Sequence, residues 1–533
     1  MNGRLKLQTR WLAWSSAAPR LALWPALLAG GLQALAIAWP GSGRAQGWLQ
    51  IASLAWLALG LVALARSPAP LREVLRAAAW RAQAFALAWL AGVFWWLHVS
   101  MHEVGGMPAA LSVAAVLLLA SALGLYYTLA ATLWVALVRR ARWGQRPLAA
   151  SALFGALWLL AELLRGTWFT GFPWGAGGYA HVDGWLAAAA PWVGVYGIGA
   201  VAAALAMRLA WPERRVRAAG WLLLVFGGVQ LLPGGSHWTR SAGQAEVELL
   251  QANIAQTEKF NEQQGVRDAL VWYGQRLLQT PAPLVIAPET AIPLLPQFLP
   301  PDYWQALQQH FARGQRLALV GLPWGDAQQG YSNALLALAP TGHAPYRYDK
   351  AHLVPFGEFI PTGFAAFVRL MDIPLGDFRA GSPRQPPIAW QGQQLSPNIC
   401  YEDLFGEELA RRLVVDGHEA TVLVNVSNIA WFGDTVAVDQ HLNISRMRAI
   451  ELGRPMLRAT NTGATALIDH RGQVQGLLPR FTRGSLVGRF EGRQGLTPYA
   501  RWAGAFGLAP LWLLGLAVLA WALADAWRVR LRR

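Results

Sequence analysis

Cysteine and charge are the two scarcest features of this 533-residue sequence. Cys400 is the only cysteine, so no intrachain disulfide can form. Charged residues make up 14% of the chain, whereas hydrophobic residues make up 54% and include 29 tryptophans. Because a soluble enzyme of this length carries more charge, the composition is typical of a membrane protein.

The usual signatures of metal and nucleotide sites are also missing. The sequence contains no HExxH or CxxC pattern, and Asp439 and His441 are spaced two apart, so they would not share a helix face as metal ligands. There is no glycine-rich phosphate-binding loop, which argues against ATP or a dinucleotide. We therefore expect neither a metal nor a cofactor.

Long apolar runs lie mainly toward the two ends of the chain. Each approaches or exceeds the roughly 20 residues needed to cross the hydrocarbon core of a bilayer. They are too many to be buried core helices of a soluble protein. They predict eight membrane-spanning helices, near 22–39, 48–65, 82–101, 109–138, 148–164, 191–211, 218–233 and 502–526.

Basic residues alternate between these predicted helices, and the formal net charge is +16. Lysines and arginines gather at the N-terminal arm, after the second, fourth and sixth helices and in the C-terminal tail, while the intervening loops offer only Arg44 and Arg165. This positive-inside pattern places both termini in the cytoplasm and the segment between helices seven and eight outside. Binding of nucleic acid by the basic tail is less favoured. A cleavable signal peptide is also less favoured, because a second apolar run follows the first almost at once.

The composition changes after residue 233, where short strand-like runs begin to alternate with helical runs. Apolar strands such as LVIA and TVLVNV are typical of a sheet covered on both faces. The predicted strands are 247–251, 283–287, 316–321, 333–338, 394–399, 421–426, 456–459 and 464–468; the predicted helices are 261–279, 302–313, 403–415 and 437–452. We expect a transmembrane bundle of seven helices (1–233), an extracytoplasmic α/β domain (234–495) and a last helix with a basic tail (496–533).

Cys400 lies where a predicted strand meets a predicted helix, a common place to display a nucleophile. A lone cysteine is more often a small buried hydrophobic residue. However, Glu289 in LVIAPET and Lys350 in YDKAHLVPFGE occupy similar strand-end positions. Glu289 can act as the base if burial raises its pKa, and Lys350 can stabilise the thiolate and an oxyanion. An accidental trio remains possible at this point, and His352 and His441 fall in no recognisable Cys/His signature.

The combination APET, YDKAHLVPFGE and NICYED resembles the Glu–Lys–Cys pattern of the nitrilase (carbon–nitrogen hydrolase) superfamily. Further segments, including QANIAQ, KAHLVPFGEFIP, MRAIELGRPMLRATNTG and GFPWG, are similar to the bacterial apolipoprotein N-acyltransferase family over nearly the whole chain. The resemblance implies an α-β-β-α sandwich with Glu289 as general base, Lys350 as electrostatic stabiliser and Cys400 as nucleophile. It further implies supporting roles for Glu358, Tyr401 and Glu402.

Two positions depart from the family's pattern. Phe260 stands where relatives often carry a tryptophan in a loop, and Ile429 stands where many read SNDAWFG. Both can alter loop packing or substrate preference. Trp431, in the same segment as Ile429, is expected either to reach the membrane interface or to cap the core.

The resemblance also implies a reaction. A phospholipid, typically phosphatidylethanolamine, acylates the cysteine to a thioester, and the α-amine of a diacylated apolipoprotein then takes the acyl chain. This is the final step of lipoprotein maturation, and it places the chain in the bacterial inner membrane with its catalytic domain in the periplasm. A membrane-tethered amidase that hydrolyses a carbon–nitrogen bond and a non-catalytic scaffold remain as alternatives.

Overall fold

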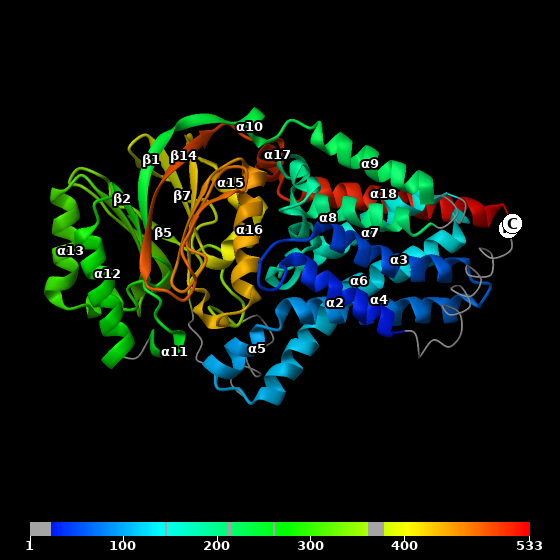
Figure 1. Ribbon diagram of the computed structural model, residues 1–533, viewed down its shortest axis with the longest axis horizontal. Coiled ribbons are helices and arrows are strands. Elements are labelled where there is room, and N and C mark those ends of the chain that lie inside the picture. The colour runs from blue at the N-terminus through cyan, green and yellow to red at the C-terminus, as the bar shows by residue number, and fades with distance from the viewer. Residues whose placement is uncertain (1–22, 144–145, 212–214, 260–261, 361–377, 533) are drawn as a thin grey trace. The chain divides into compact units, whose positions relative to one another are not determined.

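Figure 1 presents the computed structural model, which describes residues 23–143, 146–211, 215–259, 262–360 and 378–532. The chain divides into two compact units. The first contains Met1–Trp95, Ala110–Leu232 and Leu508–Arg533, and the second contains Trp96–Ala109 and Pro233–Gly507.

The first unit is a bundle of apolar helices. Within the described residues, six helices are long and apolar enough to cross a membrane, and two further predicted spans are occupied by shorter helices of 14 and 16 residues, α2 and α9. The helices are α2 (Trp24–Ile37), α3 (Gly47–Arg66), α4 (Leu71–Phe94), α6 (Ala109–Arg140), α7 (Pro147–Thr167), α8 (Ala190–Leu209), α9 (Arg215–Gln230) and α18 (Ala509–Leu531).

Three details of the predicted helices were wrong. The third begins at Leu71 rather than residue 82, so the arginines at 72, 76 and 81 lie on α4 and not in a loop. The last predicted helix is two helices, α17 (Pro498–Phe506) and α18, separated at Gly507, whose φ of +58° suits glycine. Arg165 is not in a loop either, because α7 extends to Thr167 and buries it.

The second unit contains two six-stranded sheets, as predicted for an α/β domain. The first sheet has the order β14-β1-β2-β3-β4-β5 and the second β13-β12-β11-β10-β7-β6. The first is built from β1 (Arg240–Gln251), β2 (Leu284–Ile286), β3 (Leu317–Asp326), β4 (Gly330–Leu338), β5 (Arg347–Asp349) and β14 (Gly484–Gln494). The second is built from β6 (Ile388–Trp390), β7 (Gln393–Ile399), β10 (Val422–Ser427), β11 (Met456–Thr460), β12 (Ala466–Ile468) and β13 (Val474–Leu477). Each predicted strand overlaps an observed one.

Three apolar layers hold this unit together as an α-β-β-α sandwich (Figure 1). Side chains of both sheets fill the central layer, for example Leu249 and Val424. Helices α12 (Arg267–Gln279) and α13 (Pro301–Arg313) cover the outer face of the first sheet. The second sheet is covered by α15 (Gly406–Arg412), α16 (Val436–Leu452) and α17. The short central strands β2, β7 and β10 are buried along their whole length, apart from one residue of β7, which explains why they read as apolar runs.

Candidate active site

Cys400 follows β7 directly and opens the short 3-10 helix η9 (Cys400–Leu404). Its φ of +52° is a left-handed conformation that a non-glycine residue adopts at a cost, and such strain is characteristic of functional turns. The backbone carbonyl of Cys400 accepts a hydrogen bond from Nδ2 of Asn425 at 3.3 Å, and Asn425 lies on the neighbouring parallel strand β10. The second sheet therefore presents the sulfur at the carboxyl end of its central strands.

Glu289 lies three residues beyond β2, at the corresponding end of the first sheet. Its Oε1 accepts from Asn333 Nδ2 at 2.7 Å and from Lys350 Nζ at 3.2 Å, and its Oε2 accepts from the backbone N–H of Asn428 at 2.8 Å. Burial acts to raise the pKa of Glu289, but these donors together with Lys259 outweigh it and hold the pKa below its ordinary value. The expectation of a raised pKa was wrong, because the carboxylate is surrounded by donors.

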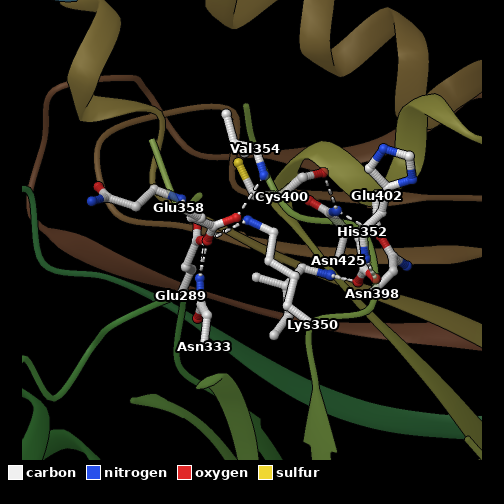
Figure 2. Close-up of polar contacts among 12 residues, drawn as sticks. Glu289, Asn333, Lys350, His352, Val354, Glu358, Asn398, Cys400, Glu402 and Asn425 are labelled. Carbon is white, nitrogen blue, oxygen red and sulfur yellow. Dashed lines mark hydrogen bonds and ion pairs between the residues drawn. The ribbon is translucent and has the colours of Figure 1, made fainter. Parts of the chain in front are cut away.

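Lys350 directly follows β5, and its ammonium lies between the carboxylates of Glu289 and Glu358 (Figure 2). Its ammonium lies 3.2 Å from Glu289 Oε1 and 2.9 Å from Glu358 Oε1, and only 1% of the residue is exposed. Burial acts to lower the pKa of Lys350, but the two carboxylates outweigh burial and raise it above the ordinary range. Lys350 is therefore a permanent cation rather than a proton carrier.

The charges of Glu289, Lys350 and Glu358 all act on the ionisation of the Cys400 thiol. Cys400 is partly exposed, whereas Glu289 and Lys350 are buried. Burial and the negative charge of Glu289 raise the pKa of Cys400 to about 12, although Lys350 opposes them. The resting state is therefore a thiol beside a carboxylate and an ammonium. When the thiol proton passes to Glu289, the negative charge moves to the sulfur, and the repulsion that raised its pKa disappears in the same step.

Glu358 and Asn333 complete the polar contacts around Lys350. Glu358 Oε1 also accepts from Asn333 Nδ2 at 2.8 Å, and its Oε2 accepts from the backbone N–H of Val354 at 2.8 Å. Asn333, on β4, thus donates to both carboxylates through one amide nitrogen. Glu358 thus forms an ion pair with Lys350, and the same contacts fix the direction of the Lys350 side chain.

Glu402 connects the turn that begins at Cys400 to the loop that carries Lys350. It is fully buried and accepts from the backbone N–H groups of Ile399, Ala351 and His352 at 2.6, 2.9 and 3.2 Å. The hydroxyl of Tyr348 donates to it as well. Burial raises the pKa of Glu402 to about 8, although these donors oppose that effect. Through its hydrogen bonds Glu402 fixes the turn of Cys400 relative to the loop that carries Lys350.

The remaining predicted residues lie at different distances from this cluster. Tyr401 is buried, with its ring 5.3 Å from that of Phe405. Trp431 is 38% exposed on the 3-10 turn η10 (Ile429–Phe432). Phe260 lies outside the described residues. Ile429, the other departure from the family's pattern, is buried at 1% exposure.

A cysteine–histidine pair is not formed with His441. Arg458 can only donate, so its Nη2 contact at 2.9 Å makes Nδ1 of His441 the acceptor. The other ring nitrogen then carries the proton and donates to Asp403 at 2.9 Å. Both nitrogens thus bind within the buried network of Asp403 and Arg458. His352 stacks on Phe405 at 3.6 Å and binds Glu408 at 2.9 Å, as a structural histidine would.

Several residues of the site are not apparent from the sequence pattern. Asn333 and Asn428 are uncharged, and Asn428 binds Glu289 through its backbone N–H. For Asn428, the position directly after an apolar strand is a signal in the sequence that could have indicated a site residue. Trp96, far away in the sequence, donates from Nε1 to Gln440 at 3.0 Å and packs its ring 4.2 Å from Phe432. It thereby supports the turn that follows Asn428.

Among the described residues, no group of three or more His, Cys, Asp and Glu side chains is arranged to hold a metal ion.

Two family models match the chain. The carbon-nitrogen hydrolase family matches residues 246–492, and the apolipoprotein N-acyltransferase N-terminal domain matches residues 29–208. The chain is 52% identical to an apolipoprotein N-acyltransferase of Verminephrobacter eiseniae over 536 residues, which cover 95% of this chain and 97% of that protein. It is 50% identical to an apolipoprotein N-acyltransferase of Ralstonia nicotianae, over 90% of this chain and 89% of that protein.

Among solved structures, the chain resembles the carbon-nitrogen hydrolase of Helicobacter pylori G27, with a TM-score of 0.36 and 14% identity over 46% of this chain and 89% of that one. The long match at 52% identity covers both compact units, and the residues that it spans include the whole Glu289, Lys350 and Cys400 cluster. The chain therefore belongs to the apolipoprotein N-acyltransferase family, and its second unit contains a domain of the carbon–nitrogen hydrolase family.

Proposed function

We propose that this protein transfers an acyl chain from a phospholipid to the α-amine of the diacylglyceryl-cysteine of an apolipoprotein, through a thioester on Cys400. The observation that supports this most is the gathering of Cys400, Glu289 and Lys350 in a chain so similar to apolipoprotein N-acyltransferases. Phosphatidylethanolamine is the proposed donor. Glu289, Lys350 and Cys400 are the proposed catalytic residues, with Glu358, Tyr401 and Glu402 supporting them.

In the first half-reaction, the thiol proton of Cys400 passes to Glu289 as the sulfur attacks the ester carbonyl of the donor. Lys350 stays beside the developing negative charge and stabilises the oxyanion of the tetrahedral intermediate. The C–O bond to glycerol then breaks, and Glu289 returns the proton to the leaving alkoxide. A thioester and a lysophospholipid result, and no proton is gained or lost overall.

In the second half-reaction, the acceptor amine attacks the thioester carbonyl, the C–S bond breaks, and Cys400 is regenerated as the thiol. An amine competes well with water only where water is excluded, and the burial of Glu289 and Lys350 supports such a site. Both substrates are held in one membrane, which raises the effective concentration of each at the site.

The proposed setting is the bacterial inner membrane, with the catalytic domain (234–495) in the periplasm and both termini in the cytoplasm. The alternation of basic residues along the chain supports this orientation. The arginines on α4 remain consistent with it, because the rule counts charges near helix ends as well as those in loops.

The test is to incubate the purified full-length protein with phosphatidylethanolamine and a synthetic diacylated lipopeptide, and to measure the mass of the lipopeptide by mass spectrometry. A gain of one acyl group on its α-amine is expected. Release of ammonia from small amides, with no acylated lipopeptide, would instead indicate the amidase. A protein that forms neither product and does not react at Cys400 with a thiol-reactive lipid analogue would be the scaffold.

A further inference from the structure

The second half-reaction of the proposed function has a proton balance that the Glu289, Lys350 and Cys400 group cannot meet alone. The α-ammonium of the acceptor carries three hydrogens, and the amide that it becomes keeps one. Of the two protons lost, one returns to the sulfur of Cys400 as the thiol. The other has to leave the nitrogen before the amine can attack, and it needs an acceptor of its own.

Glu289 is a poor acceptor for that first proton. A free α-ammonium has a pKa of about 7.7–8.0. Lys350, Asn333, Lys259 and the backbone of Asn428 hold the pKa of Glu289 below its ordinary value of 4.5. Proton transfer from the ammonium to Glu289 is therefore unfavourable by a factor of more than about 1,000. Glu289 suits the later proton, which the nitrogen loses after attack, when it has become far more acidic.

Lys259 is a second buried lysine at the same site, and the reaction described above does not use it. It ends the short helix α11 (Gln256–Lys259) and is 2% exposed. Its Nζ donates to the backbone carbonyl of Glu289 at 3.3 Å, and the charges of both Glu289 and Cys400 act on its ionisation. Lys259 therefore lies beside the base and within electrostatic reach of the sulfur.

The two lysines differ in their partners. Lys350 is held between two carboxylates, whereas the hydrogen-bond acceptor of Lys259 within the described residues is a neutral carbonyl. Burial lowers the pKa of Lys259 to about 8, although Glu289 and Cys400 oppose that effect. At neutral pH about a tenth of such a group is the free amine. Its basicity matches that of an α-amine, as efficient proton transfer requires.

We propose that the amino group of Lys259 is a further catalytic base, which takes the first proton from the α-ammonium of the acceptor in the second half-reaction. The neutral amine of Lys259 accepts an N–H proton and becomes an ammonium, and the acceptor becomes a free amine. The acceptor nitrogen then bonds to the thioester carbon, and the C–S bond breaks. Glu289 carries the second proton from nitrogen to sulfur, and Lys259 releases its proton to water when the product leaves.

This role assigns different tasks to the charges around Lys259. Within the described residues, the charges that act on the ionisation of Lys259 are those of Glu289, after β2, and Cys400, after β7. Lys350 binds the carboxylate of Glu289 on its other side and is itself paired with Glu358. Once Cys400 is acylated, its thiol no longer titrates, and Glu289 and the incoming ammonium set the protonation of Lys259.

The experiment measures single-turnover transfer from a preformed acyl-enzyme to a diacylated lipopeptide, using the full-length protein and its Lys259→Gln and Lys259→Arg variants. At pH 7 both variants are expected to transfer about 100-fold more slowly than the wild type, because neither side chain accepts a proton. Arginine keeps the positive charge, so it separates a base from a purely electrostatic group. Glu258→Gln, an exposed change on the same helix, is the matched control and should transfer normally.

The pH dependence is the second readout. Above about pH 8 the lipopeptide amine arrives without its extra proton, so the deficit of both variants should shrink as the pH rises. A deficit that stays constant with pH, or full activity of the arginine variant, would overturn the role of Lys259. So would wild-type transfer rates in both variants.

This inference rests on the proposed function, but the two can fail separately. If the wild-type protein forms no acyl-enzyme from phospholipid, the proposed function fails. If it forms the acyl-enzyme and acylates the lipopeptide, but the Lys259 variants do so equally fast, only the role of Lys259 fails.

Discussion

The two sheets contribute opposite kinds of group to the site. The end of the first sheet supplies the charges, Glu289 and Lys350, with Glu358 on the loop that follows β5. The end of the second sheet supplies a neutral sulfur on a strained turn whose backbone carbonyl binds Asn425, and it supplies the backbone N–H of Asn428, which donates to Glu289. We call these the charged half and the sulfur half of the site.

The difference shows how a thiol with a high pKa can still react. The charged half holds a fixed cation and a carboxylate that accepts three hydrogen bonds, so both charges are in place before substrate arrives. The sulfur half stays neutral until proton transfer moves that charge onto Cys400. A preorganised charge of this kind costs no reorganisation during the reaction.

The largest effect on acyl transfer is expected from removing the sulfur of Cys400. Cys400→Ala removes the atom that carries the acyl group and should lower transfer on the order of 10⁴-fold or more. Cys400→Ser should keep the fold and lose nearly all turnover, because an alkoxide is harder to form than a thiolate. Lipopeptide acylation by each purified variant measures this. Normal transfer by the alanine variant would show that another residue is the nucleophile.

The next largest effect should come from removing the cation of the charged half. Lys350→Met leaves Glu289 and Glu358 facing each other without the cation that pairs with both, which should cost about 3–5 kcal/mol of stability as well as activity. The double variant Lys350→Met/Glu358→Gln removes one of the two carboxylate charges and should regain part of that stability but no activity. Thermal unfolding in detergent compares them, and equal stability of the single variant and the wild type would contradict the assigned ion pairs.

The pH dependence of stability provides a related test. Glu289 has a lowered pKa in the folded protein, so its stabilising effect is present above its ordinary value of 4.5 and is lost as the pH falls below it. Lys350 has a raised pKa, so its effect is present below its ordinary value of 10.5 and is lost as the pH rises beyond it. The difference in unfolding temperature between wild type and Lys350→Met should therefore be largest between these values. A difference that grows below pH 4 would contradict this.

A smaller effect is expected at Asn333, which connects the two carboxylates of the charged half. Asn333→Leu removes a donor from both Glu289 and Glu358 and should raise the pKa of Glu289 toward its ordinary value. Loss of a buried hydrogen bond to a charged group costs about 1.5–3 kcal/mol, or roughly 10- to 150-fold in rate if it acts on the transition state. The rate of acyl-enzyme formation between pH 4 and 7 checks this, and an unchanged pH profile would count against it.

The smallest effect should appear at Trp96, which supports the sulfur half from outside. Trp96→Phe keeps a ring against Phe432 but removes the N–H that binds Gln440, at a cost of about 0.5–1.5 kcal/mol. Trp96→Ala should cost more, since it also empties a buried ring site. Unfolding temperatures of both variants give the order. Equal values for the two would mean that the ring does not support the turn after Asn428.

The sequence predicted the charged half better than its amide partners. Glu289 stands out because a charged residue at the end of an apolar strand is unusual, and Lys350 stands out through the YDKAHLVPFGE motif; the structure brings both beside Cys400. Asn333 lies within a strand and Asn428 acts through its backbone, so no side-chain pattern marks their roles, and the one signal is that Asn428 directly follows an apolar strand. The lowered pKa of Glu289 could not be foreseen either, because it depends on how many donors surround one carboxylate.

Fold elements were predictable where they were apolar throughout. The central strands β2, β7 and β10 were found from their apolar runs. The edge strand β14, along which exposed and buried positions mix, and the three-residue strands β5 and β6 were missed. The break at Gly507 was also missed, since the apolar pattern continues across it and only the backbone conformation reveals two helices.

The account depends on the sulfur of Cys400 carrying the acyl group, and one measurement addresses this directly. The full-length protein is incubated with phosphatidylethanolamine alone, digested, and analysed by peptide mass spectrometry. The account predicts one acyl group on the peptide that contains Cys400, removed by hydroxylamine as a thioester is. An unmodified Cys400 peptide, or an acyl group on another residue, would contradict it.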